Sequence, residues 1–231
     1  MNAILLAAGY GRRLRSITKK KPKCLVSIGK KKLLEIWIEK LIFLGVKKIL
    51  INTHYLSKEV KRFISNSEHK KKIKIFHEKK LLGTGQTVYQ NRKFLNKKNS
   101  LIVHADNFCL DDLKKLIDRH KNRPKKCSMT MMTFTCEEPK LCGIIEKNKL
   151  GIVNKMHEKS NFPKSKIANA AIYVVSKSFL KNLKKIKNLK DISKDIIPFF
   201  YEKIYTYHTK KPFFDIGTQK NLKKAREIAK L

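Results

Sequence analysis

The chain has 231 residues, of which 42% are hydrophobic and 32% are charged, and its formal net charge is +37. This length allows one large α/β domain with a substantial core, and the apolar content excludes a disordered chain. No apolar run approaches the roughly 20 residues of a membrane span, and the apolar stretch at residues 1–8 is too short and too uncharged for a signal peptide. We therefore expect a cytoplasmic protein without a membrane partner.

The strong positive charge does not by itself indicate nucleic-acid binding. Lys and Arg together number 55, but only 8 of these are Arg, and the lysines are spread along the whole chain. Nucleic-acid-binding surfaces favour Arg and cluster their charge with stacking aromatic residues. The composition is more typical of a codon bias towards Lys, Ile and Asn, so we expect no specific nucleic-acid partner. An RNA-binding protein remains an alternative that only the charge suggests.

The cysteines are odd in number and scattered, and none forms a C-x-x-C pair. Without such a pair or neighbouring histidines, a zinc site is not indicated. We expect reduced thiols in the protein core. The five positions are Cys24, Cys109, Cys127, Cys136 and Cys142.

Short apolar runs alternate with amphipathic stretches along the first half of the chain. In chain order they predict a strand at 3–6, a helix at 33–44, a strand at 48–52, a helix at 58–64, a strand at 73–76, a helix at 84–94, a strand at 101–104 and a helix at 111–121. The helix at 33–44 carries an apolar stripe at helical spacing that includes Leu34, Trp37 and Leu41. A β-α-β-α rhythm with short links predicts a parallel, doubly wound sheet.

The second half of the chain has more strands and fewer helices. Strands are predicted at 129–135, 143–146, 151–156 and 168–175, and helices at 177–183, 193–199 and 218–229. This pattern indicates a mixed edge of the sheet or a lid rather than another β-α unit. The fold class predicted for the whole chain is α/β, with a Rossmann-like, doubly wound, mixed but mainly parallel sheet in a single domain, residues 1–231.

A glycine- and arginine-rich loop follows the first predicted strand. It reads Leu-Leu-Ala-Ala-Gly-Tyr-Gly-Arg-Arg-Leu over residues 5–14. Glycines let backbone N–H groups approach phosphate oxygens, and a cationic side chain neutralises charge that develops there. The loop is neither a dinucleotide-binding G-x-G-x-x-G fingerprint nor a P-loop. By itself it also fits a tight turn beside a solvated arginine pair.

The loop continues into Thr-Lys-Lys-Lys-Pro-Lys at residues 18–23. The composite resembles the signature L-A-A-G-x-G-x-R-L followed by T-x-x-x-P-K of the sugar-1-phosphate nucleotidyltransferase family, the enzymes that make nucleotide sugars. The resemblance implies that Arg13 and Lys23 are catalytic and contact substrate phosphates. Arg12 stands where Thr is frequent and Ser16 where Pro is usual. The loop residues that the resemblance assigns to nucleotide binding are Leu6, Ala7, Ala8, Gly9 and Gly11.

Further motifs of the family follow in its order. Leu-Gly-Thr-Gly at 82–85 resembles the L-G-T-[AG] turn at the nucleotide, which implies nucleotide contacts from Gly83 and Thr84. Glu-Lys at 158–159 and Asn-Ala-Ala-Ile-Tyr at 169–173 resemble E-K and N-A-G-I-Y, with Ala171 in place of Gly. The sugar-phosphate-binding residues that this implies are Gly143, Glu158, Lys159 and Asn169. Residues 1–125 would then bind mainly the nucleotide, and residues 126–231 mainly the sugar phosphate.

Two aspartates stand where the family binds its metal. Asp106 follows a predicted strand, and Asp215 opens Asp-Ile-Gly-Thr, which matches the family's D-I-G-T. Mg²⁺ takes few protein oxygens and is completed by substrate phosphates. The resemblance therefore implies Mg²⁺ as the cofactor, held by Asp106 and Asp215. In the family's reaction the sugar phosphate attacks the α-phosphorus of a nucleoside triphosphate. This reaction needs no covalent nucleophile, because catalysis consists mostly of positioning and charge neutralisation.

The base of the nucleotide is inferred from Glu78. Related enzymes have a Gln five residues before the turn glycine, where it reads uracil or thymine, and here that position is Glu78. A carboxylate accepts two parallel hydrogen bonds, which guanine offers from N1–H and N2–H. We therefore expect GTP and a sugar 1-phosphate as substrates, as in the short guanylyltransferases for mannose- or heptose-type 1-phosphates. A solvated Glu78 beside two lysines is the other interpretation.

Several alternatives stay open at this point. UTP, dTTP or CTP could replace GTP, and an amino-sugar phosphate is a further candidate acceptor. A phosphocholine cytidylyltransferase would need an aromatic cage for its quaternary ammonium, for which Tyr173, Phe108 and Trp37 are candidates. A further alternative is a non-catalytic regulatory protein of the same fold. We expect a monomer or small homo-oligomer, and the family implies a role in nucleotide-sugar and surface-polysaccharide biosynthesis.

Overall fold

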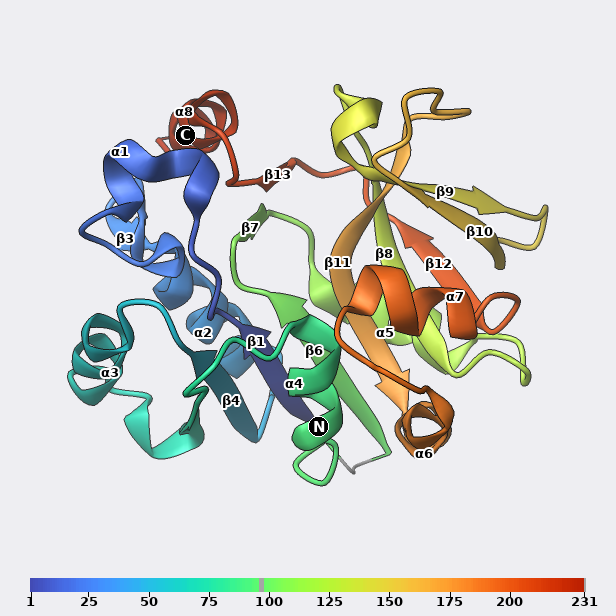
Figure 1. Cartoon of the computed structure of the whole chain (residues 1–231), viewed down its shortest axis with the longest axis horizontal. Coiled ribbons are helices and arrows are strands. Elements are labelled where there is room, and N and C mark those ends of the chain that lie inside the picture. Colours follow the sequence, from blue (N-terminus) through green and yellow to red (C-terminus); the bar gives the residue numbers. More distant parts are fainter. Residues whose placement is uncertain (96–97, 231) are drawn as a thin grey trace. The chain divides into compact units, whose positions relative to one another are not determined.

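The chain divides into two compact units, each built from several segments of the sequence. The structure is a computed structural model that describes residues 1–95 and 98–230, without the side chain of residue 15 (Figure 1). Unit 1 contains Met1–Leu81, Val103–Leu110 and Phe213–Leu231, and unit 2 contains Leu82–Ile102 and Asp111–Pro212. Both units therefore draw on distant parts of the chain. The predicted roles of residues 1–125 and 126–231 remain predictions.

Unit 1 is built on a parallel sheet. Strand β1 (Asn2–Leu6) pairs with β4 (Lys48–Thr53), and β4 pairs with β5 (Ile73–His77), all in parallel. In register, Leu6 lies opposite Asn52, and Thr53 lies opposite His77. The carboxyl ends of the three strands therefore meet at one edge, where ligands bind in open α/β sheets.

Helices and short antiparallel pairs complete unit 1. The helices are α1 (Arg15–Thr18), α2 (Leu33–Phe43), α3 (Ser57–Ser65) and α8 (Gln219–Ile228). The antiparallel pairs are β2 (Ser27–Ile28) with β3 (Lys31–Lys32), and β7 (Asn107–Cys109) with β13 (Phe213–Asp215). The predicted stripe on α2 is confirmed: Leu34, Trp37 and Leu41 are each at most 1% exposed.

Unit 2 is a mixed sheet with helices. Its strands are β8 (Met129–Thr135), β9 (Gly143–Lys147), β10 (Val153–Glu158), β11 (Ile167–Ser176) and β12 (Ile204–His208), and its helices are α4 (Thr84–Gln90), α5 (Leu113–Lys121), α6 (Lys177–Asn182) and α7 (Ile197–Phe199). Strand β11 pairs antiparallel with β8 and β9, whereas β12 pairs parallel with β8. Strand β6 (Asn99–His104) carries the chain from unit 2 to unit 1.

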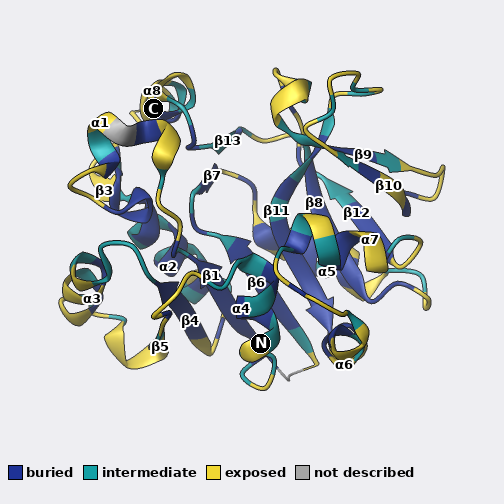
Figure 2. Cartoon of the chain, viewed as in Figure 1, coloured by how far each residue is buried: buried dark blue, intermediate teal, exposed yellow. Residues whose placement is uncertain are grey.

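The α/β class and the mixed, antiparallel character of the second half are confirmed. Within each unit, Figure 2 shows the strands largely buried and the exposed residues on helices and loops. In the part of the chain that the structure describes, no helix is long and apolar enough to span a membrane.

Several element boundaries differ from the sequence prediction. The helix predicted at 84–94 ends at Gln90, where the side chain of Asn91 turns back onto the Thr87 carbonyl. The helix predicted at 111–121 begins at Leu113, because Asp112 caps it by accepting the Lys114 N–H. The segment predicted as a helix at 193–199 is a π-helical turn, Ile192–Ile196, followed by α7.

The strand predicted at 151–156 also begins later, at Val153, because Gly151 has a left-handed φ of +82°. Strands β7, β12 and β13 were not predicted. Strand β12 has the β-branched and aromatic composition that favours strands, whereas β7 and β13 are three-residue segments too short for a periodic signal.

His120 on α5 generates a prediction about acid stability. It is 0% exposed, its Nδ1 lies 2.8 Å from the Thr130 hydroxyl, and burial lowers its pKa from 6.5 to about 3, with nearby Arg123 adding to the effect. Below about pH 6.5 His120 is protonated in the unfolded chain but stays neutral in the folded chain. The stability that the neutral, buried imidazole gives at neutral pH is therefore lost as pH falls towards 3. We expect the free energy of unfolding to drop by about 2 to 3 kcal/mol between pH 7 and pH 4.5 from this residue alone.

His120→Asn keeps a polar partner for Thr130 but does not titrate. The loss of unfolding free energy that His120 causes between pH 7 and pH 4.5 should therefore be absent in this variant, as measured by urea unfolding at the two pH values. The matched control is His77→Asn, on an exposed residue, which should retain the wild-type pH dependence. Equal pH dependence in wild type and His120→Asn would contradict the prediction.

Candidate functional site

Four charged residues that the sequence analysis singled out lie together in unit 1. Lys23 Nζ donates to Asp106 Oδ2 at 2.6 Å and to Asp215 Oδ1 at 3.2 Å. Arg13 Nη2 donates to Asp215 Oδ2 at 3.0 Å. The side chain of Lys23 is 10% exposed, whereas those of Asp106 and Asp215 are 38% and 41% exposed. Two accessible carboxylates therefore converge on one nearly buried ammonium group, and we call these four residues the charge cluster.

The backbone explains why residues so distant in sequence meet here. Asp215 is the last residue of β13, where it lies opposite Asn107 of β7 in the antiparallel pair. The Ile216 N–H then donates to the Asp106 carbonyl at 3.0 Å, and Asn221 on α8 donates to the Asp215 carbonyl at 2.9 Å. These backbone contacts fix both carboxylates at the same end of the β7–β13 pair.

The charges in the cluster stabilise one another. Burial works against the ammonium of Lys23, but Asp106 and Asp215 outweigh it and hold its pKa above the ordinary value. Burial likewise acts to raise the pKa of Asp106, but Lys23 and His104 outweigh it, so the pKa lies below its usual range. Lys23 is therefore an ammonium and Asp106 a carboxylate at neutral pH.

The glycine-rich loop is shaped by two close approaches. Gly11 has a φ of +65°, and a Cβ there would stand 2.8 Å from the methyl group of Thr18. The Thr18 hydroxyl donates back to the Gly11 carbonyl at 2.9 Å. A Cβ at Gly217 would stand 2.4 Å from the Arg13 guanidinium. Glycine at 217 thus leaves the space in which Arg13 lies beside Asp215.

Glu78 lies at the carboxyl end of β5, in a hydrogen-bonded chain that leads to the loop. The residue is 2% exposed, and its Oε1 accepts from Asn52 Nδ2 at 2.8 Å. Asn52 Oδ1 in turn accepts the backbone N–H of Ala7 at 2.7 Å. The interpretation of Glu78 as a solvated surface residue is wrong, because its carboxylate is buried and hydrogen-bonded.

Leu6 and Ala8 are buried, at 7% and 5% exposure, while a Cβ at Gly9 would meet no atom within 4 Å. The loop segment thus passes from a packed strand end to an open backbone at Gly9, where a ligand could approach.

The residues predicted for the sugar phosphate lie in unit 2. Gly143 on β9 pairs with Glu158 on β10, and a Cβ at Gly143 would stand 2.8 Å from Glu158 Oε2. Asn169 on β11 donates to the Tyr173 hydroxyl at 2.8 Å, and its Nδ2 lies 3.9 Å from the sulfur of Met156. Gly143, Glu158 and Asn169 thus border a common group of strands.

Two backbone features mark this part of unit 2. Lys159 has a φ of +52° and Ala171 a φ of +53°, a conformation that costs a residue with a side chain about 1 kcal/mol or more. Asn169 Oδ1 holds the second of these turns by accepting the Ala171 N–H at 2.9 Å. Ala171 stands where the family motif has Gly, and the left-handed backbone explains that preference.

The turn at residues 82–85 packs against a segment that the sequence analysis missed. The Gly85 N–H donates to the Lys190 carbonyl, and the Thr84 hydroxyl donates to Asp191 Oδ2 at 3.0 Å. A Cβ at Gly83 would stand 2.5 Å from the Lys190 carbonyl oxygen, so only glycine fits. Asp191 also raises the pKa of Glu158, in addition to the larger effect of partial burial and against that of Lys159.

Two polar residues that contact the predicted site residues were not identified from the sequence: Asn52 beside Glu78, and Asp191 beside Thr84. Asn52 had a usable signal, since a polar side chain at the end of an apolar strand points to the ligand edge of the sheet. Asp191 heads a helix-capping pattern, which does not by itself distinguish a structural residue from a functional one.

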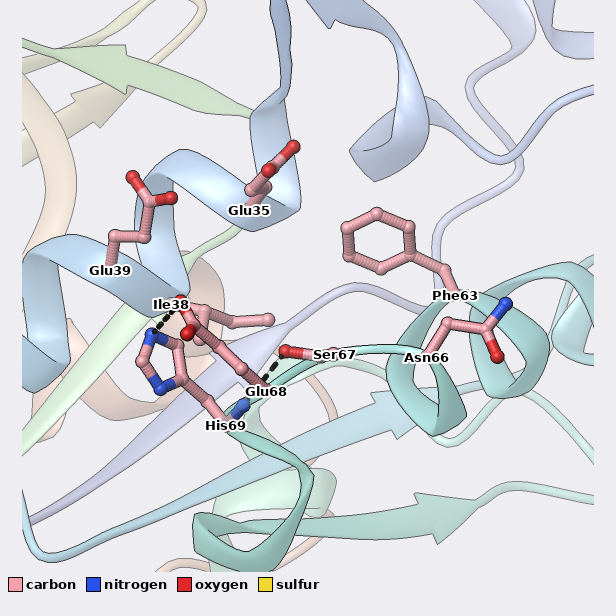
Figure 3. Close-up of a pocket in the computed structure, with 8 residues that line it drawn as sticks. All are labelled: Glu35, Ile38, Glu39, Phe63, Asn66, Ser67, Glu68 and His69. Atoms are coloured by element: carbon pink, nitrogen blue, oxygen red, sulfur yellow. Dashed lines mark hydrogen bonds and ion pairs between the residues drawn. The ribbon is translucent and has the colours of Figure 1, made fainter.

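A separate pocket of unit 1 is also acidic (Figure 3). It encloses about 370 Å³ between α2, α3 and the turn after α3. Glu39 there pairs with Lys31, Glu68 pairs with His69, and Glu35 accepts a backbone N–H at the start of α2. Because these carboxylates already have partners, we assign the pocket no role.

The chain is similar to known proteins over nearly its whole length. The family model described as nucleotidyl transferase matches residues 2–230. The chain is 26% identical to a glucose-1-phosphate adenylyltransferase of Mycoplasma mobile over 94% of its length, and 29% identical to the mannose-1-phosphate guanylyltransferase catalytic subunit beta of Danio rerio over 96%. It spans 64% and 62% of those two relatives, less than two thirds of either.

A third relative matches end to end. The D-glycero-alpha-D-manno-heptose 1-phosphate guanylyltransferase of Aneurinibacillus thermoaerophilus is 26% identical, with 98% of this chain and 97% of the relative covered. Among solved structures, HddC from Yersinia pseudotuberculosis matches with a TM-score of 0.82 at 24% identity, covering 98% of both chains. This likeness confirms the predicted Rossmann-like fold of the nucleotide-diphospho-sugar transferase type.

The ion pairs of Lys23 generate a stability prediction. Lys23→Met would leave Asp106 and Asp215 without their shared cation, so we expect the free energy of unfolding to fall by about 2 kcal/mol, less than for a fully buried pair because the carboxylates are partly exposed. Urea unfolding at neutral pH measures this. Lys31→Met removes the exposed partner of Glu39 and should leave the unfolding midpoint unchanged; equal losses in both variants would contradict the account.

Proposed function

The chain belongs to the nucleotidyl transferase family, and on that basis we propose that it transfers GMP from GTP to a sugar 1-phosphate, of mannose or D-glycero-D-manno-heptose type, and releases pyrophosphate. The observation that carries the proposal is the charge cluster, in which Lys23 and Arg13 donate to Asp106 and Asp215 at 2.6 to 3.2 Å. The cations of such a cluster can offset the negative charge of two reacting phosphates, and the carboxylates can hold a metal ion.

The chemistry is a single displacement. A phosphate oxygen of the sugar 1-phosphate attacks the α-phosphorus of GTP, a new P–O bond forms, and the bond from the α-phosphorus to the bridging oxygen of pyrophosphate breaks. The acceptor is already ionised, so no general base is needed. Arg13 and Lys23 offset the negative charge on the reacting phosphates, and the N–H groups of the loop at Gly9 and Gly11 orient them.

Asp106 and Asp215 fit the demands of Mg²⁺. Their oxygens converge on a single cationic atom, Lys23 Nζ, and a hard divalent cation bound by one or two carboxylates takes its other oxygens from substrate phosphates and water. Among residues 1–95 and 98–230, no group of three or more His, Cys, Asp and Glu could hold a metal without such help. When bound, Mg²⁺ would neutralise phosphate charge during transfer.

The sugar phosphate is assigned to the residues of unit 2. Glu158 and Asn169 offer acceptors and a donor for sugar hydroxyl groups, and the glycine at 143 leaves room beside the Glu158 carboxylate. Lys159 supplies a positive charge for the phosphate. Gly83 and Thr84 are assigned to the nucleotide, with Asp191 holding the Thr84 hydroxyl in place.

The choice of guanine rests on Glu78. The two oxygens of a carboxylate match the parallel N1–H and N2–H donors of guanine, and Asn52 Nδ2 orients this carboxylate by donating to it. Because Glu78 is only 2% exposed, recognition of the base by its carboxylate requires the residues that cover it to shift when the nucleotide binds. The guanylyltransferases among the relatives, and the structure of HddC with GMP-PN, support GTP.

One of the relatives is an adenylyltransferase, so ATP is the nucleotide to compare with GTP. The phosphocholine alternative loses its support, because Trp37, Phe108 and Tyr173 are each at most 3% exposed and belong to the core. The regulatory alternative predicts a damaged cluster, whereas all four charged residues are in place. Oligomeric state remains a prediction of a monomer or small homo-oligomer.

Pyrophosphate release by the purified chain with Mg²⁺ tests the proposal. GTP, UTP, CTP, dTTP and ATP are crossed with mannose-, heptose-, glucose- and N-acetylglucosamine 1-phosphates and with phosphocholine. We expect release with GTP and a mannose- or heptose-type acceptor, and its loss in Asp106→Ala. Release with another nucleotide would overturn the base assignment, and no release with any pair would overturn the proposed activity.

Base recognition is tested with ITP, which lacks the 2-amino group of guanine. We expect wild type to prefer GTP over ITP by about tenfold or more in kcat/KM, and Glu78→Gln to lose this preference together with about 10- to 100-fold of its activity with GTP. Glu68→Gln, at an 82% exposed side chain, is the matched control. An unchanged preference in Glu78→Gln would mean that Glu78 only orients Asn52.

A further inference from the structure

Residues 52–55, at the carboxyl end of β4, hold the glycine-rich loop at three places. Asn52 Oδ1 accepts the Ala7 N–H at 2.7 Å, at the start of the loop. His54 Nε2 lies 3.1 Å from the hydroxyl of Tyr10 in the middle of the loop. Tyr55 donates its hydroxyl to the Thr18 carbonyl at 3.0 Å, near the loop's end. Three side chains of one short segment thus contact the loop over more than ten residues.

The same segment holds Glu78 from two directions. Asn52 Nδ2 donates to the Glu78 carboxylate at 2.8 Å, and His54 Nδ1 lies 2.9 Å from the Glu78 backbone carbonyl. A carbonyl oxygen only accepts, so Nδ1 must carry the proton in that bond. In the neutral ring Nε2 is then an acceptor, and the Tyr10 hydroxyl donates a hydrogen bond to it.

Aromatic contacts keep Tyr10 in place between these groups. Its ring meets the ring of His54 edge-on at 5.6 Å and that of Tyr55 at 5.5 Å, and the Arg12 guanidinium lies 5.2 Å from its centroid. Because Arg12 directly precedes Arg13, the position of Tyr10 also bears on the arginine of the charge cluster. Tyr10 is 38% exposed, so its hydroxyl bond can be removed without disturbing a buried core.

We propose that residues 52–55 form a brace that couples recognition of the base at Glu78 to the position of the phosphate-binding loop. Through His54 and Asn52, a base that shifts Glu78 also shifts Tyr10 and Ala7, and with them the loop that carries Arg13. Asn52, His54 and Tyr10 are positioning residues, since they act through Glu78 and the loop. The inference rests on the proposed function, because it needs a nucleotide at Glu78.

Tyr10→Phe and His54→Asn test the brace by removing the same hydrogen bond from its two ends. Phe keeps the ring contacts of Tyr10, and the amide of Asn can still donate to the Glu78 carbonyl. We expect each variant to lower kcat with GTP by about five- to tenfold, with KM for the sugar phosphate nearly unchanged. The double variant should be no worse than either single variant, because the bond is lost only once. His69→Asn, in the pocket of Figure 3, is the control and should match wild type.

Limited trypsin digestion gives a second readout that activity does not enter. Trypsin cuts after Lys and Arg, which crowd residues 12–21, and fragment masses locate the cuts. In wild type we expect GTP with Mg²⁺ to protect this loop more than ATP does. In Tyr10→Phe and His54→Asn that difference should disappear, so that GTP and ATP protect the loop equally.

The outcomes separate the brace from the proposed function. If wild type turns over no pair of substrates and no nucleotide protects the loop, the proposed function fails. If wild type is active, yet both single variants keep wild-type kcat and GTP-specific protection, the brace is wrong and the function stands. Additive losses in the double variant would likewise overturn the brace, since Tyr10 and His54 would then act independently.

Discussion

The site depends on one ammonium group that is shared by two carboxylates. Asp106 and Asp215 come from chain segments more than a hundred residues apart, and like charges so close would repel one another without a cation between them. Lys23 supplies that cation from a nearly buried position, 2.6 Å and 3.2 Å from the two side chains. The cluster is therefore held together before any substrate binds, with its two carboxylates fixed around one positive charge.

The backbone around the cluster is arranged so that these charged side chains can meet. The short β7–β13 pair brings Asp215 beside Asn107, next in the chain to Asp106, and the glycine at 217 leaves space for Arg13. Meanwhile the parallel strands of unit 1 end at one edge, which brings Ala7, Asn52 and Glu78 into one hydrogen-bonded chain. The charge cluster and the residues proposed to recognise the base thus lie in a single unit.

The sequence predicted those parts of the fold and site that leave a local or composite signal. The apolar stripe of α2, the strand before the loop and the ordered motifs led to the fold class and to the charged residues that the structure brings together. Strands β7 and β13 escaped because three residues show no period and depend on a partner distant in sequence. His54 escaped for a related reason: its two hydrogen bonds join Tyr10 and Glu78, and no spacing in the sequence reveals that contact.

The reaction run in reverse tests whether the charge cluster carries nucleotidyl transfer. Pyrophosphate and GDP-mannose or a GDP-heptose are supplied with Mg²⁺, and the formation of GTP is followed. We expect GTP formation by wild type and by Lys31→Met, and a loss of at least about a hundredfold in Asp215→Asn. GTP formation by Asp215→Asn at the wild-type rate would contradict it, because the reaction would then proceed without the cluster.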